Sequence, residues 1–251
     1  MKLTGNTVFI TGGGSGIGRA FAESFHKLGN QVIISGRRRG HLDATIKANP
    51  GMHSVELDIQ DPANIATIAK TLIKEYPKLN VLINNAGVMQ PDNAAGEIDE
   101  AVLVSTITTN LLGPIRMTSA LIEHLKKQNT AAVINVTSGL AFVPLAITAI
   151  YSSTKAALHS YTLSMRYRLK DSTVKVLELA PPWVRTDLMN SNEAPLAMPL
   201  DEFTTEAIKI LGTDAEEIVV DRAKMLRNNP GPSEAAFVNQ FNDMILAQVA
   251  H

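Results

Sequence analysis

The sequence predicts an α/β fold: a single-domain, doubly wound parallel sheet with helices on both faces. Short apolar runs rich in β-branched residues alternate with longer segments of helical periodicity along the 251 residues. Such alternation is typical of strands joined by crossover helices. The short runs are apolar at successive positions, which indicates strands that are buried on both faces. We therefore expect one sheet between two helix layers.

Six runs are predicted to form the strands, and each is bounded by turn residues. They comprise residues 7–11, 31–35, 52–57, 81–84, 132–136 and 174–179. Between the third and fourth runs, the pair Asp61-Pro62 predicts a helix start, with the acid as N-cap and the proline in the first turn. No repeat, low-complexity segment or linker divides the chain, so we expect residues 1–251 to form a single domain.

The chain changes character after Pro181, because several further prolines interrupt it. We expect residues 186–200 to form a lid-like substrate loop and residues 201–251 to form a helical tail packed on the same domain. Residues 217–220 are the only strand-like run in this tail. A clear seventh strand is therefore not expected.

Composition and charge indicate an ordinary globular protein. The formal net charge is -1 and the pI is about 6.6, so nothing favours a nucleic-acid or anionic-membrane partner. The longest apolar passage, residues 140–150, is far shorter than the roughly 18 residues that a membrane span needs, and the first apolar run is too short for a signal peptide. The lack of cysteine excludes thiol catalysis and fits a reducing compartment. We expect a cytoplasmic protein.

A glycine-rich turn directly follows the first predicted strand and opens a helix. Glycine lets the backbone turn sharply and approach a pyrophosphate, while the helix start offers free N–H groups and a positive dipole. The spacing Gly-x-x-x-Gly-x-Gly differs from the commoner Gly-x-Gly-x-x-Gly fingerprint, and it lacks the Gly-Lys-Ser/Thr ending of a P-loop. In this strand-turn-helix context the turn predicts a dinucleotide site. Its candidate binding residues are Gly12, Ser15, Gly16, Ile17 and Gly18.

The end of the second predicted strand is expected to meet the adenosine ribose. Sites for NAD usually place an acid there to hold the 2′-hydroxyl, whereas sites for NADP place an arginine on the 2′-phosphate. This sequence offers Arg37, Arg38 and Arg39 and no carboxylate. NADP(H) is therefore favoured, with Arg37 and Arg38 as candidate binding residues, and NAD(H) stays the alternative.

A second group of residues predicts carbonyl chemistry. Tyr151 and Lys155 lie one turn apart on one face of a helix that Tyr151 is expected to open. A free tyrosine has a pKa of ~10, which a nearby ammonium is expected to lower. Ser138 lies upstream and could donate a hydrogen bond to the substrate oxygen that Tyr151 protonates. The three side chains predict a site where a carbonyl and an alcohol interconvert.

Together these motifs resemble the short-chain dehydrogenase/reductase family, NAD(P)-binding oxidoreductases with a Rossmann fold. The resemblance runs from about residue 2 to residue 186. Beyond the glycine turn it rests on motifs in the right order and spacing: Leu57-Asp58-Ile59, Asn84-Asn85-Ala86-Gly87, Asn110, Ser138, Tyr151-x-x-x-Lys155 and Pro181-Pro182-Trp183-Val184-Arg185-Thr186. It implies hydride transfer between NADP(H) and a small-molecule carbonyl or alcohol substrate.

The resemblance also implies a role for each matched residue. Tyr151 is the general acid/base, Lys155 binds the cofactor ribose and lowers the pKa of Tyr151, Ser138 polarises the carbonyl, and Asn110 holds a relay water near Lys155. Taken alone, Asn110 would be interpreted as a surface residue. The implied cofactor contacts are Asp58 and Ile59 at the adenine, Asn84, Asn85, Ala86 and Gly87 along the cleft, Tyr151 and Lys155 at the ribose, and Val184 and Thr186 at the nicotinamide.

Two features depart from the family pattern. The common Pro-Gly after the sixth strand is Pro181-Pro182 here, and the second proline stiffens the turn and removes an N–H donor. The family's usual carboxy-terminal strand is not evident. Because that strand often contributes to a tetramer interface, we expect a homodimer built on long helices at 101–126 and 151–170, with a tetramer as the alternative.

Other function classes are weaker matches to the sequence. A Ser/His/Asp hydrolase would use Ser138 and His159, yet no Gly-x-Ser-x-Gly elbow is present, and a helix-packing histidine is the simpler interpretation. The histidines show no metal-ligand spacing, so no metal is expected. The main alternative is a catalytically silent dinucleotide-binding sensor or partner protein on the same scaffold. Apolar residues near the predicted site suggest a medium-sized, largely apolar ketone or aldehyde as the substrate.

Overall fold

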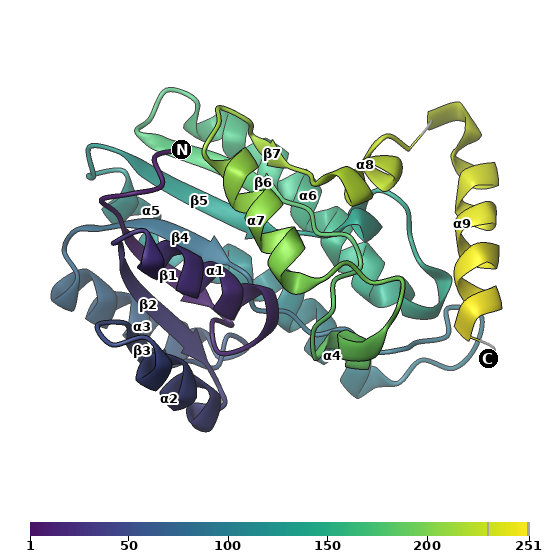
Figure 1. Cartoon of the computed structure of the whole chain (residues 1–251), viewed down its shortest axis with the longest axis horizontal. Coiled ribbons are helices and arrows are strands. Elements are labelled where there is room, and N and C mark those ends of the chain that lie inside the picture. Colours follow the sequence, from purple (N-terminus) through teal and green to yellow (C-terminus); the bar gives the residue numbers. More distant parts are fainter. Residues whose placement is uncertain (230, 250–251) are drawn as a thin grey trace.

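A parallel sheet lies at the centre of the computed structural model, which describes residues 1–229 and 231–249 (Figure 1). The strands within these residues are β1 (Thr7–Thr11), β2 (Gln31–Gly36), β3 (His53–Glu56), β4 (Leu79–Asn84), β5 (Ala131–Val136), β6 (Val174–Leu179) and β7 (Glu217–Ile218). Their spatial order is β3-β2-β1-β4-β5-β6-β7, and every neighbouring pair is parallel. The predicted doubly wound parallel sheet is confirmed.

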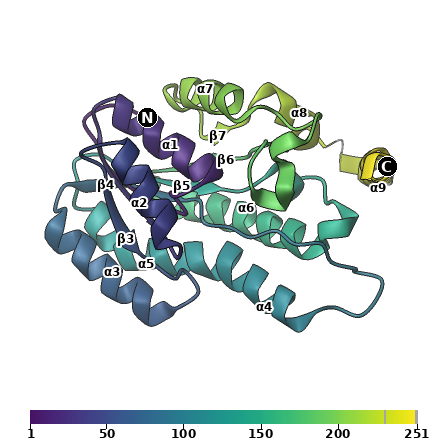
Figure 2. The same ribbon diagram turned by 60° about the horizontal axis from the view of Figure 1, so that its bottom comes forward.

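Helices cover both faces of the sheet. The α-helices in the described part of the chain are α1 (Gly16–Lys27), α2 (Arg39–Ala48), α3 (Pro62–Glu75), α4 (Glu100–Ile107), α5 (Gly113–Leu125), α6 (Ala149–Leu169), α7 (Leu200–Leu211), α8 (Asp221–Arg227) and α9 (Glu234–Val249). Figure 2 shows α1 and α7 on one side of the sheet and α3, α5 and α6 on the other. The strand order reverses between β1 and β4, and ligands of such sheets bind at the carboxyl ends of the strands at this reversal.

Alternate residues of one strand supply two separate cores. In β1, Val8 and Ile10 pack in the core under α1 and α7, whereas Phe9 packs in the core under α3, α5 and α6. All three side chains are fully buried. Because strand side chains alternate between the two faces, a strand covered on both sides must be apolar at successive positions. This explains why the unbroken apolar runs predicted the strands.

The six predicted strands are confirmed, with shifts of at most two residues at their ends. The predicted helix start is confirmed as well, because the carboxylate of Asp61 accepts a hydrogen bond from the amide of Ala63 at 2.8 Å. The carboxy-terminal strand needs a correction. Glu217 and Ile218 pair in parallel with Glu178 and Leu179 of β6. These two residues lie within the strand-like run 217–220, which is too short to predict a strand.

The segment predicted as a lid-like loop, residues 186–200, is closed at its base by a bridge between Val184 and Met198. A 3-10 segment, Leu188–Glu193, lies inside it, and Met189 and Asn190 there have φ of 56° and 52°. Two successive non-glycine residues in this left-handed region cost free energy, and the conformation persists only where the surroundings hold it. The indole nitrogen of Trp183 donates to the hydroxyl of Ser191 at 2.7 Å and so fixes the segment from outside.

The carboxy-terminal helix α9 lies at one end of the molecule, beyond α8 (Figures 1 and 2). Its Phe241 packs in a small core with Val143, Leu145 and Leu226. Residues 230 and 250–251 of the predicted tail lie outside the described residues. None of the helices that the structure describes is both long and apolar enough to cross a membrane.

Candidate active site

The glycine turn between β1 and α1 is shaped by its backbone. Gly12 has φ of +68°, in the left-handed region that favours glycine. Gly18 has no room for a side chain, because a Cβ there would lie 2.3 Å from both the carbonyl oxygen of Gly12 and the side-chain amide nitrogen of Asn85. Ser15 stands at the N-cap of α1 without a side-chain bond to the helix. The first turn of α1 therefore keeps N–H groups for an external acceptor.

Residues after β4 hold this turn in place. The side-chain amide of Asn85 donates to the carbonyl oxygens of Thr11 and Gly12, at 2.9 and 3.2 Å. The hydroxyl of Thr11 accepts in return from the amides of Asn85 and Ala86, at 3.0 and 3.1 Å. Asn84 departs from the expectation, because its side chain turns inward and donates to Thr118 at 2.9 Å and to Asn135 at 2.8 Å. It supports the sheet and does not line the cleft.

Arg37 and Arg38 lie exposed after β2, as the sequence predicts for residues that meet a phosphate. The guanidinium of Arg38 donates to the hydroxyl of Ser15 at 3.1 Å, which links the end of β2 to the glycine turn. Arg37 lines a pocket together with Glu56, Asp58 and Asn64. The Glu56 carboxylate could not be predicted from local sequence. It lies near Arg37 because the register of β3 against β2 places Glu56 beside Gly36.

The other predicted contacts of the cofactor gather around the same edge. Asp58 is held by its own loop, since its carboxylate accepts from the amide of Gln60 at 3.0 Å. Ile59 is buried and packs against the position of Gly113, where a Cβ would come within 2.7 Å of it. Thr186 is buried with its methyl 3.4 Å from a Cβ built on Gly16. Val184 is also buried, and Ile17 is partly buried on the core under α1.

Ser138, Tyr151 and Lys155 come together as the sequence predicts. Ser138 follows β5, and its side chain lies close to the phenol of Tyr151 on α6. The ammonium of Lys155 donates to the carbonyl oxygen of Val136 at 2.8 Å and lies 5.5 Å from the centre of the Tyr151 ring. All three side chains are buried. The helix begins at Ala149, slightly before the predicted start.

The ionisation of this cluster differs from the expectation. Burial raises the pKa of Tyr151 to about 12, and the nearby Ser138 hydroxyl only partly opposes that rise. This rise is opposite in direction to the lowering that is expected from Lys155. Burial also lowers the pKa of Lys155 to about 8. Desolvation disfavours the charged form of each group, and it is the largest cause of both shifts.

Asn110 lies in a break between two helices that the sequence predicted as one helix over 101–126. A π-helical turn, Thr108–Leu112, separates α4 from α5, and such turns are rare and frequent at functional sites. The Asn110 amide is buried, accepts from the amide of Val88 and donates to its carbonyl, both at 2.8 Å. A Cβ on Gly87 would lie 3.4 Å from Asn110 Oδ1 and 3.7 Å from Lys155 Nζ. Asn110, Gly87 and Lys155 therefore meet around one point.

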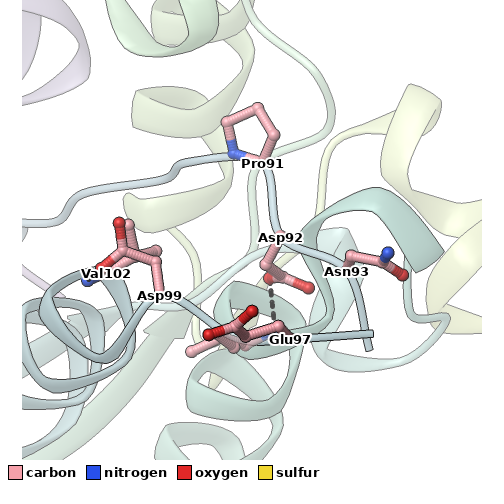
Figure 3. A pocket seen from close by; sticks show the side chains of 7 residues that line it. Pro91, Asp92, Asn93, Glu97, Asp99 and Val102 are labelled. Carbon is pink, nitrogen blue, oxygen red and sulfur yellow. Dashed lines mark hydrogen bonds between the residues drawn. The ribbon is translucent and has the colours of Figure 1, made fainter. Parts of the chain in front are cut away.

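Asp92 is a further residue that the sequence did not single out. It lies in the loop after β4 and accepts hydrogen bonds from the first two amides of α6, those of Ala149 at 3.1 Å and Ile150 at 2.8 Å. Figure 3 shows it in a pocket with Glu97 and Asp99. The residue at the N-cap of α6 makes no such side-chain bond. Asp92 thus caps the helix that carries Tyr151 and Lys155 from a distant loop, which no local sequence signal reveals.

Comparisons with known proteins agree with this geometry. The short chain dehydrogenase family model matches residues 6–197. The uncharacterized oxidoreductase DltE of Bacillus subtilis is 38% identical over 91% of this chain and 93% of its own length. The NADP-dependent 3-hydroxy acid dehydrogenase of Schizosaccharomyces pombe is 30% identical over 74% of each chain. A short chain dehydrogenase from Burkholderia cenocepacia, solved in complex with NADP, has a TM-score of 0.84 at 26% identity and covers 96% of this chain and 98% of its own. The chain is an oxidoreductase of the short-chain dehydrogenase family.

Proposed function

We propose that the protein is an NADP(H)-dependent oxidoreductase that interconverts a carbonyl and an alcohol, with Tyr151 as the general acid/base. One observation carries the proposal: Ser138 and Tyr151 are buried next to each other and lie beside Lys155 at the carboxyl ends of the strands. A tyrosine within reach of a substrate oxygen can supply the proton that a carbonyl gains on reduction.

The residues at the sheet edge fit a dinucleotide. The uncapped start of α1 suits a pyrophosphate, and two exposed guanidiniums, those of Arg37 and Arg38, suit a 2′-phosphate. Glu56 in the same pocket would oppose a phosphate, so the two arginines must outweigh it. The similar Burkholderia protein was solved with NADP, and a 3-ketoacyl-(acyl-carrier-protein) reductase from Brucella melitensis at 25% identity was solved with NADH. NADP(H) is favoured and NAD(H) is the alternative.

The nicotinamide, when bound, supplies or accepts the hydride. The protein supplies orientation and protons. At neutral pH a phenol with its pKa raised to about 12 is protonated, so Tyr151 can donate a proton to a carbonyl oxygen during reduction. Lys155, with its pKa lowered to about 8, can return a proton at little cost in free energy. Asn110 holds the backbone at Val88 beside Lys155 and is proposed to keep the relay water there.

Replacing Tyr151 by Phe tests the acid/base role. The phenylalanine keeps the ring and removes the proton, so we expect turnover to fall by about 10³-fold or more while NADPH still binds. NADPH oxidation against aldehydes, ketones, diketones and acyl thioesters measures the first quantity, and fluorescence titration measures the second. Wild-type protein that binds NADPH and reduces no carbonyl in the panel would favour the silent sensor instead.

Replacing Arg37 by Asp tests the choice of cofactor. A carboxylate repels a 2′-phosphate and suits a 2′-hydroxyl, so we expect the affinity for NADPH to fall by about 10- to 100-fold while that for NADH changes little. Arg39 pairs with Asp43 within α2, and Arg39→Asp is the matched control. Equal losses for both cofactors in the Arg37 variant would contradict the assignment.

We also propose a single-domain, cytoplasmic homodimer that acts on a small, largely apolar carbonyl compound. The exposed apolar side chains of Val104 on α4 and of Leu163 and Tyr167 on α6 support an interface on these helices. Light scattering tests the dimer, and a clean tetramer would contradict it.

A further inference from the structure

Glu178 is a fully buried carboxylate for which the proposed reaction has no use. It lies on β6 with a side chain that is only 1% exposed. Burial of a carboxylate is costly unless hydrogen bonds compensate for the lost water. Two donors do so here. The hydroxyl of Thr137 donates to Oε1 at 2.6 Å, and Nδ1 of His159 lies 2.8 Å from Oε2.

These two partners belong to the two elements that carry the catalytic groups. Thr137 directly precedes Ser138 at the end of β5. His159 lies one helical turn beyond Lys155, on the same face of α6. Glu178 therefore joins the strand end that presents Ser138 to the helix that presents Tyr151 and Lys155.

The imidazole of His159 is also held from outside. The ring of Phe142 meets it edge-on, with ring centres 5.0 Å apart and planes at 76°. The guanidinium of Arg227 lies 4.8 Å from the Phe142 ring and is itself bound to Glu217 by two hydrogen bonds, at 2.6 and 3.1 Å. Such edge-on and cation–ring contacts limit the rotamers of the groups between them. His159 is thus held on both sides. Its contacts explain its presence as a packing residue, and no hydrolytic role is needed.

We propose that Thr137, Glu178 and His159 form a positioning network that sets the hydroxyl of Ser138 against the phenol of Tyr151. The effect expected on catalysis rests on the proposed function, whereas the geometry of the network does not. The three residues touch neither substrate nor cofactor in this role. They act through the strand end and the helix that they join.

The geometry is tested without turnover by the Cζ chemical shift of Tyr151, which is sensitive to the position of the Ser138 hydroxyl beside the phenol. The chain has four tyrosines, and Tyr151→Phe assigns the signal. Thr137→Val and Glu178→Gln are expected to shift it, whereas Thr137→Ser keeps the hydroxyl and is expected to leave it in place. Thr204→Val is the matched control, because it removes a buried hydroxyl that donates to Leu200 on α7, away from the site. An unchanged Tyr151 signal in both Thr137→Val and Glu178→Gln overturns the proposal.

The catalytic consequence is tested on the same variants with a carbonyl that the wild type reduces. Thr137→Val and Glu178→Gln are expected to lower kcat about tenfold with less than about twofold change in KM for NADPH, and Thr137→Ser to restore kcat. If Glu178→Gln does not fold, His159→Gln replaces it. Failure of the wild type to reduce any carbonyl refutes the proposed function, while the Tyr151 signal still decides the network. Unchanged kcat in Thr137→Val, or an equal loss in Thr204→Val, counts against positioning.

Discussion

The glycine turn and the cluster around Tyr151 lie at the same edge of the sheet but are built in different ways. The turn, residues 11–18, takes its shape from glycines and from backbone carbonyls that Asn85 ties together. The cluster of Ser138, Tyr151 and Lys155 consists of buried side chains whose ionisation is displaced by desolvation. A substitution that adds volume should therefore disturb the turn. A substitution that changes the functional group at nearly constant volume should disturb the cluster.

The largest expected effect is steric and falls on the turn. Gly18→Ala places a methyl group 2.3 Å from two atoms, so we expect a loss of about 3 kcal/mol in the free energy of unfolding, together with loss of NADPH binding. Urea unfolding and a binding titration measure the two effects. Gly40→Ala on α2 is the control: its Cβ meets nothing within 4 Å, and a gain of about 0.5 kcal/mol is expected. If the Gly18→Ala variant is as stable as the wild type, the turn rearranges to accommodate the methyl group and the prediction is wrong.

The second prediction concerns pH and falls on the cluster. Because burial lowers the pKa of Lys155 from 10.5 to about 8, the unfolded chain binds more protons than the folded one between these values. Stability should therefore rise with pH in that window, by about 1 kcal/mol per pH unit at most. Tyr151 acts in the opposite sense, since its raised pKa costs stability only above pH 10. Urea unfolding between pH 8 and 9.5 should show this rise in the wild type and a flatter profile in Lys155→Met; parallel profiles would contradict the assignment.

The smallest expected effect distinguishes a helix cap that only stabilises the fold, Asp61, from a cap that also positions the cluster, Asp92. Asp92→Ala and Asp61→Ala each remove a carboxylate from a helix start, and each should cost about 1 kcal/mol of stability. Only Asp92 caps the helix that carries Tyr151, so only its loss should also lower kcat, by about tenfold. Thermal unfolding and steady-state kinetics on both variants measure this. Equal kcat values in the two variants would show that Asp92 stabilises the helix and has no further effect on turnover.

Local patterns and spacing predicted most of the fold and the residues of both regions. The strands were visible because both of their faces are buried, and the helix start at Asp61 was visible because its cap lies beside it in the sequence. Three features escaped prediction for one reason: they depend on residues that meet only in the folded chain. Glu56 reaches Arg37 through strand register, Asp92 caps a helix that starts 57 residues later, and the pKa of Tyr151 is set by its burial. The short strand β7 lies in a run that looked strand-like in the sequence but was too short to predict a strand.

The central strand pair of the sheet has a consequence for folding. β1 pairs with β4, so Val8 lies beside Val81, and a long stretch of chain must close before these two strands meet. Loop closure costs entropy before such a distant pairing gives contacts, which slows folding. Asn85, which secures the glycine turn, lies just beyond β4. A nascent chain that ends before this residue therefore lacks the contacts that shape the dinucleotide turn, although the whole glycine sequence has already been made.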